Sequence, residues 1–334
     1  MKKLGALMIP ALVLWAASGV RADVTIRYQT EFKPAAALQP LMEQIMKSAQ
    51  AASGVSVSMK GNKGYSTAGK WTEIFDFASG EVTLLDPEHK TFATLPLAQL
   101  GDKMAGAIPQ VNAQQAEAAQ QAMASIKSYV ASRMTGNTAE IQGVQAEERE
   151  LTLTMDLPIM NQTMNQMMNQ SGPGMKMVMH IWTAKKEEAL RVPAIRELTG
   201  YYAWQKYVLN PAGMMQKMAG KVPGLSESVG PLLEEIFKNQ SVILRSQMEM
   251  YMPFLATVAK QMAAKDQPPM DIDPDAPVMV MTQEVAELSS APVDASLFEI
   301  PKDYTAASAD DMVKDLLKAQ NPAMPIAPKT GAPN

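Results

Sequence analysis

The stretch MKMVMHIW, residues 175–182, combines three methionines with one of the two histidines of the chain. Successive side chains of a β-strand point to opposite faces, so a strand here would have two different faces. One face would carry Met175, Met177, Met179 and Ile181, and the other Lys176, Val178, His180 and Trp182. The stretch therefore predicts a strand with one methionine-rich face and one largely polar face.

The same alternation recurs later in the chain. SQMEMYM, residues 246–252, would place Met248, Met250 and Met252 on one face and its polar residues on the other. A last strand over residues 278–288 carries Met279 and Met281, although Val278 and Val280 make both of its faces apolar. We expect the methionine faces of these strands to turn toward the same side of one sheet.

The remaining pattern predicts an α+β fold. Short apolar runs separated by turn residues between residues 55 and 94 are typical of an antiparallel meander. Helical spacing is expected over residues 35–52 and in insertions near 97–134 and 193–238. We expect a single domain over residues 23–305, in which a curved antiparallel sheet has helical insertions covering one face. Residues 306–334 are expected to form a short helix and a disordered tail.

The N-terminus reads as an export signal. Lys2 and Lys3 precede an apolar run, and residues 20–22 have small side chains at the positions that a signal peptidase inspects. Residues 1–22 are therefore expected to be a signal peptide cleaved near Ala22. This predicts a periplasmic or secreted protein.

Composition excludes several classes of function. The chain has no cysteine, which excludes disulfides, zinc–cysteine sites and cysteine nucleophiles by count. Its net charge of −4 becomes more negative when the basic residues of the signal are removed, so no nucleic-acid partner is expected. Methionine is abundant, at 28 residues against 7 phenylalanines, and its flexible thioether suits adaptable apolar surfaces.

No motif nominates a catalytic residue, a metal ligand or a cofactor. Residues 64–70, GYSTAGK, approach the spacing of a phosphate-binding loop, but Trp71 replaces the required hydroxyl and the stretch precedes a strand. Residues 271–275, DIDPD, resemble the start of a calcium loop, but Ala276 stands where glycine is needed. His89 lies in a turn and is expected to face solvent. We therefore expect a protein that is not an enzyme.

The methionine-rich faces allow three interpretations. They can be ordinary interior packing, or a site for copper(I), which accepts thioether and imidazole ligands. Against copper, the alternation places His180 on the opposite face from Met177 and Met179, and methionines from neighbouring strands would have to converge on the ion. The third interpretation is an apolar, deformable wall that binds an acyl chain or another hydrophobic ligand. Its expected wall consists of Met175, Met177, Met179, Ile181, Met248, Met250, Met252, Met279 and Met281.

Two passages carry a resemblance to a known family. FASGEVTLLDPEHKTF, residues 77–92, resembles a hairpin of exported bacterial domains of unknown function. SAPVDASLFEIPKDY, residues 290–304, resembles the way in which those domains close. Their sheet is similar to the half-barrel of the periplasmic lipoprotein carriers of the LolA/LolB type.

The resemblance implies a non-enzymatic protein that holds a lipid or other hydrophobic ligand inside a curved sheet, with helices as a lid. It also implies a transient membrane or outer-membrane partner. The alternatives are a methionine-rich periplasmic copper(I)-binding protein and a structural or interaction protein without a ligand.

Overall fold

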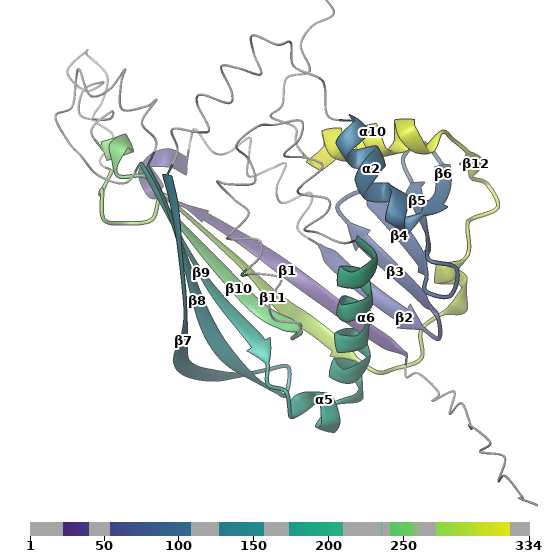
Figure 1. The fold of residues 1–334 in the computed structure, drawn as a ribbon, viewed down its shortest axis with the longest axis horizontal. Coiled ribbons are helices and arrows are strands. Elements are labelled where there is room, and N and C mark those ends of the chain that lie inside the picture. Colours follow the sequence, from purple (N-terminus) through teal and green to yellow (C-terminus); the bar gives the residue numbers. More distant parts are fainter. Residues whose placement is uncertain are drawn as a thin grey trace, which may run out of the picture.

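The computed structural model describes residues 23–39, 54–107, 127–156, 174–209, 235, 241–256, 259 and 272–320. These residues form an α+β fold built on one open sheet of twelve strands (Figure 1). The strands are β1 (Val24–Pro34), β2 (Val55–Lys60), β3 (Lys63–Ala68), β4 (Trp71–Asp76), β5 (Glu81–Asp86), β6 (Thr91–Pro96), β7 (Lys127–Ile141), β8 (Val144–Asp156), β9 (Met175–Ala184), β10 (Ile243–Tyr251), β11 (Met279–Ser289) and β12 (Thr305–Ala306).

The sheet order is β12-β6-β5-β4-β3-β2-β1-β11-β10-β9-β8-β7. All neighbours are antiparallel except β12, which runs parallel to β6. Strands β2 to β6 follow each other through short turns, as the turn-punctuated sequence predicts. Gly69 occupies one of these turns with a φ of 60°, a conformation that favours glycine. The phosphate-loop-like stretch is thus a β3–β4 hairpin, since Ala68 pairs with Trp71.

The helices are short and several lie against one face of the sheet. They are α2 (Leu97–Ala107), α5 (Glu188–Arg191), α6 (Pro193–Leu209) and α10 (Ala309–Gln320), with 3-10 turns η1 (Ala36–Leu38) and η2 (Ala295–Phe298). Figure 1 shows α6 beside β1 and β2, and α2 and α10 beside β4 to β6. No helix within the described ranges is both long and apolar enough to cross a bilayer.

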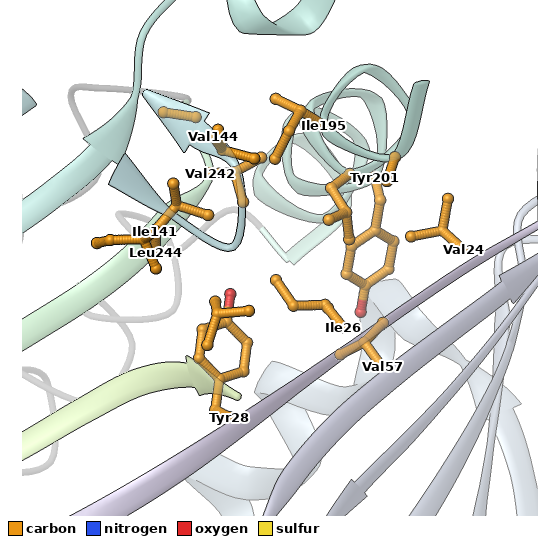
Figure 2. Packing of buried hydrophobic residues seen from close by; sticks show 14 of the residues in the cluster. Val24, Ile26, Tyr28, Val57, Ile141, Val144, Ile195, Tyr201, Val242 and Leu244 are labelled. Carbon is orange, nitrogen blue, oxygen red and sulfur yellow. The ribbon is translucent and has the colours of Figure 1, made fainter. Parts of the chain in front are cut away.

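The face of the sheet that contacts α6 is here called the inner face. Tyr28 of β1 defines it, because its hydroxyl lies 3.3 Å from the hydroxyl of Tyr202 on α6 and donates to the carbonyl of Ile243 over 2.9 Å. Figure 2 shows Tyr201 of α6 reaching toward Val57 and Ile26 on the strands. These contacts form the largest apolar cluster of the described residues and fix α6 on the sheet.

The β4–β6 half of the sheet is covered on both faces. On its inner face Trp71, Phe75 and Leu84 pack against α2 and α10. On the opposite face, here called the outer face, Ile74 and Leu85 pack against Val293 and Phe298 of the segment that precedes β12. The passage over residues 290–304 therefore covers the outer face of this half, while α10 covers its inner face.

Most predicted elements are confirmed, with one clear error. The α+β class, the antiparallel meander and the strands over residues 175–182 and 246–252 are present. The helix expected near 97–134 ends at Ala107 in α2, and from Lys127 onward the chain is strand β7, so the prediction is wrong over residues 127–134. These residues pair with β8 instead, from Lys127 opposite Asp156 to Met134 opposite Arg149. Residues 1–22, 108–126 and 321–334 lie outside the described residues, as does most of the predicted insertion beyond α6.

The outer face of β7 to β9 carries a buried polar cluster around Glu148. This carboxylate, with only 4% of its side chain exposed, accepts hydrogen bonds from Thr135 and Asn137 and lies 2.7 Å from Nδ1 of His180. Burial alone raises the pKa of the Glu148 carboxyl, but the hydrogen bonds from Asn137, Thr135 and His180 outweigh burial and hold that pKa below its ordinary value. Thr135 and Asn137 flank a bulge in β7, where Gly136 has a φ of 82°. Glu148 thus ties the bulge to the sheet.

We expect Glu148→Ala to lower the free energy of unfolding by about 2 kcal/mol, because three polar groups lose their buried acceptor. Urea denaturation at pH 7 measures the change. Glu147→Ala is the matched control: it removes the neighbouring carboxylate, whose side chain points to the other face. An equal loss in both variants would contradict the role of Glu148. Since its pKa is lowered in the folded state, the contribution of Glu148 should persist above its ordinary pKa and be lost as the pH falls through the lowered value.

Candidate ligand-binding face

Two rows of apolar side chains cross five neighbouring strands on the inner face. Residues directly opposite each other in antiparallel strands lie on the same face. The first row consists of Leu151, Met179, Met248, Met281 and Phe32, each paired with the next. The second row consists of Leu153, Met177, Met250, Met279 and Pro34. Phe32 lies four residues from Tyr28 along β1, which places both rows on the face that contacts α6.

The rows make a wide apolar wall with methionines in its middle. Five strands spaced about 4.8 Å apart give each row a span of about 19 Å. Leu151 and Leu153, at one end, are buried, whereas the methionines of β9, β10 and β11 are only half-buried. Unbranched thioether side chains in such positions can change rotamer and fill irregular shapes. The centre of the wall therefore combines accessibility with adaptability, and neither row contains a polar side chain.

The remaining predicted residues lie at the ends of this wall. Met175 pairs with Met155 beyond the second row, and Ile181 is buried opposite Arg149 and Ser246 beyond the first. Met252 follows the last residue of β10 and packs with Met250 against a small cluster. The fully buried members of this cluster are Leu38, Ala256, Ala259, Ile272 and Val278. The predicted sharing of one face is confirmed for the methionines of β9, β10 and β11, while ligand binding by them stays a prediction.

Pairing also resolves the ambiguity of the last strand. Met279 and Met281 face inward because they pair with Met250 and Met248, whereas Val280 pairs with Glu249 on the outer face. The outer face of these strands is largely polar, with Arg245 bonded to Glu284 and stacked over Trp182. Over Met279 to Thr282, β11 thus has one apolar inner side and one largely polar outer side, as is common in antiparallel sheets.

A buried arginine interrupts the apolar inner face. Arg149 lies two residues before Leu151 of the first row, on the same face of β8. Only 6% of its side chain is exposed. Its Nη1 donates to the carbonyl oxygen of Glu235 over 2.9 Å and lies 3.1 Å from the Glu235 carboxylate. Its Nε is buried with no acceptor among the described residues. This pair joins Glu235 to the inner face of β8, beside the methionine-rich wall.

The histidines do not join the methionines. His180 pairs with Glu150 and Gln247 on the outer face, as the alternation predicted, and is bound to Glu148. His89 lies 2.7 Å from Asp86 in the turn after β5 and is mostly exposed. Asp86, Glu88 and His89 are the one His, Asp and Glu group within the described ranges whose spacing could hold a metal ion. Glu88 is already bonded to Lys70, and Asp86 accepts from the backbone of its own turn.

Sequence reasoning missed two inner-face residues. Arg149 shares the parity of Leu151 and Leu153, so the alternation of β8 already placed it on the apolar face. Glu73 likewise lies between Trp71 and Phe75 on the inner face of β4. In both cases, the sequence shows a charged residue at a position where the alternation places apolar residues.

No protein-family model matches the chain, and no curated protein sequence matches it.

Proposed function

We propose that this protein binds a hydrophobic ligand, such as an acyl chain, against the inner face of β8 to β11 and β1. The observation that carries the proposal is the pair of five-strand apolar rows, whose central methionines are half-buried. Ordinary core positions on the same sheet, such as Leu84 and Leu244, are fully buried. Apolar side chains that are partly accessible and flexible are typical of surfaces that accept varied apolar partners.

The Arg149–Glu235 pair supports a removable cover over this wall. When this ion pair opens, Glu235 no longer holds the inner face beside Leu151, and that end of the wall becomes open to a ligand. The proposal extends to a carrier role like that of the LolA/LolB-type half-barrels. In that role an exported protein takes a lipid-like ligand from, or delivers it to, a membrane-bound partner. The acidic balance of the chain and its predicted signal segment agree with this role.

A pair of adjacent substitutions on β11 tests the proposal. Met281→Asn places an amide in the centre of the first row, and we expect it to weaken binding of a fluorescent fatty acid about ten-fold or more, since an unpaired buried amide costs about 1–3 kcal/mol. Thr282→Asn introduces the same side chain at the next position, on the outer face and equally half-buried. It should leave the affinity unchanged. Fluorescence titration measures both.

Met281→Leu, which keeps the apolar character, should stay within about three-fold of the unmodified protein. Mass spectrometry of lipid extracted from protein purified from the periplasm gives an independent readout. Equal effects of the two asparagine variants, or an unmodified protein that takes up no fatty acid and carries no lipid, would contradict the proposal.

A further inference from the structure

Glu73 is a carboxylate without a partner on the helix-covered half of the inner face. It pairs with Ser66 on β3 and Leu84 on β5, so all three side chains project to the same side. Leu84 is buried, and so are Trp71 and Phe75, the aromatic residues two positions before and after Glu73 on β4. Glu73 itself is only half-buried. Its carboxylate therefore lies at an accessible point within an otherwise closed apolar layer.

No described residue compensates the charge of Glu73. It has no hydrogen bond and no salt bridge among the described residues, in contrast to Glu148, Glu150 and Glu188 elsewhere on the sheet and α5. Burial alone raises the pKa of the Glu73 carboxyl to about 7. A half-buried carboxylate that has no cation and no hydrogen-bond donor among the described residues is costly to ionise, and such a group in a native protein requires an explanation.

The surroundings of Glu73 are aromatic. Trp71 and Phe75 flank it on β4, and Tyr201 of α6 lies 6.2 Å from Phe75 between ring centroids. Burial, the neighbouring Tyr202 and the charge of Glu73 all raise the pKa of the Tyr201 hydroxyl, which places the carboxylate within electrostatic reach of that ring. Aromatic faces attract cations, and rings around a carboxylate are the usual means of binding organic ammonium groups.

A second polar group on this face also lacks a partner. Nε1 of Trp71 is buried without an acceptor in the described part of the chain, and 4% of the residue is exposed. Two residues along one strand separate side chains on the same face by about 7 Å. Trp71 and Glu73 thus present a free donor and a free anion close together. An ammonium ligand that also carries a hydroxyl oxygen matches both.

We propose that Glu73, Trp71, Phe75 and Tyr201 form a binding site for a small organic cation, a quaternary or alkylated ammonium group bearing an oxygen acceptor. In this site Glu73 neutralises the cation, the three rings contact its methyl groups, and Nε1 of Trp71 donates to its oxygen. The site lies on β4 under α2 and α6, apart from the methionine rows, and does not depend on the proposed acyl-chain binding.

Choline and its uncharged carbon isostere, 3,3-dimethylbutan-1-ol, test this site by isothermal titration calorimetry at pH 8. The unmodified protein should bind choline at least ten-fold more tightly than the isostere, because only choline carries a charge for Glu73. Glu73→Gln keeps the size of the side chain and should weaken choline binding at least ten-fold. Glu81→Gln removes an equivalent charge at an exposed position of β5 and should leave binding unchanged.

Trp71→Phe should weaken choline several-fold by removing the donor and the larger ring. Near-ultraviolet circular dichroism of each variant verifies that the fold is retained. Absence of choline binding at millimolar concentration, equal affinity for choline and the isostere, or undiminished binding by Glu73→Gln each overturns the proposal. Fatty-acid uptake through the methionine wall should be the same in Glu73→Gln as in the unmodified protein, so the two proposals fail separately.

Discussion

Replacing Arg149 with alanine should lower the free energy of unfolding by about 3–5 kcal/mol, the usual loss when one partner of a buried ion pair is removed. Arg149 is almost fully buried on the inner face, and its guanidinium holds both the carbonyl and the carboxylate of Glu235. The variant also leaves a cavity beside Leu151 and Ile181. Urea denaturation followed by circular dichroism measures the loss.

A double substitution separates the ion pair from simple packing. Arg149→Met with Glu235→Leu replaces two charges by apolar side chains of similar size, a change that is often neutral or stabilising for buried pairs. We expect this double variant to be at least as stable as the unmodified protein. If the double variant loses as much stability as Arg149→Ala, the pair is not the source of the effect.

Glu73→Gln should stabilise the protein at alkaline pH and have little effect in acid. The ordinary pKa of 4.5 applies in the unfolded chain, whereas burial raises the folded-state value to about 7. The unfolded state therefore releases its proton first, and stability falls as the pH rises from about 4.5 through 7. At about 1.4 kcal/mol per pKa unit, the penalty at pH 8 is on the order of 3 kcal/mol. Glutamine removes it.

The measurement is the free energy of unfolding of both proteins at pH 4 and pH 8. All other titrating groups are shared, so their contributions cancel in the difference between variant and unmodified protein. A gain at pH 8 that disappears at pH 4 supports the desolvated carboxylate, and an equal difference at both values would falsify it. A residue that destabilises the fold and yet binds a cation would show the trade-off between stability and function expected of a binding site.

The strands were predictable because alternation is a strong local signal. Residues 175–182 and 246–252 each have methionines at every second position, and in the sheet these methionines lie on one face. Which strands become neighbours was not predictable from either stretch alone. The pairing of Met177 with Met250 depends on a connection of 58 residues between β9, which ends at Ala184, and β10, which begins at Ile243. The rows across five strands are therefore a tertiary feature.

The prediction failed where local pattern and tertiary pairing disagree. Residues 127–134, KSYVASRM, contain only two strong strand formers, Tyr129 and Val130, and follow a Gln- and Ala-rich stretch that favours helix. Only pairing with β8 makes them a strand. Arg149 and Glu73 were not predicted for a different reason: the alternation of apolar residues does not show what a charged residue in the same phase does. On the inner face, such a charged residue is a polar group that the fold must accommodate.

The two rims of the sheet end differently. At one edge of the sheet, the short strand β12 pairs with β6. At the other edge, no described strand lies beyond β7, and the pairing of β7 is interrupted by the bulge between Met134 and Thr138. An unpaired rim invites strands from other molecules, and bulges and basic residues are common means of preventing this. Lys127 and Arg133 supply the basic residues here. We therefore expect that loss of the tether from Glu148 to that bulge would favour strand-to-strand association, and would reduce solubility as well as stability.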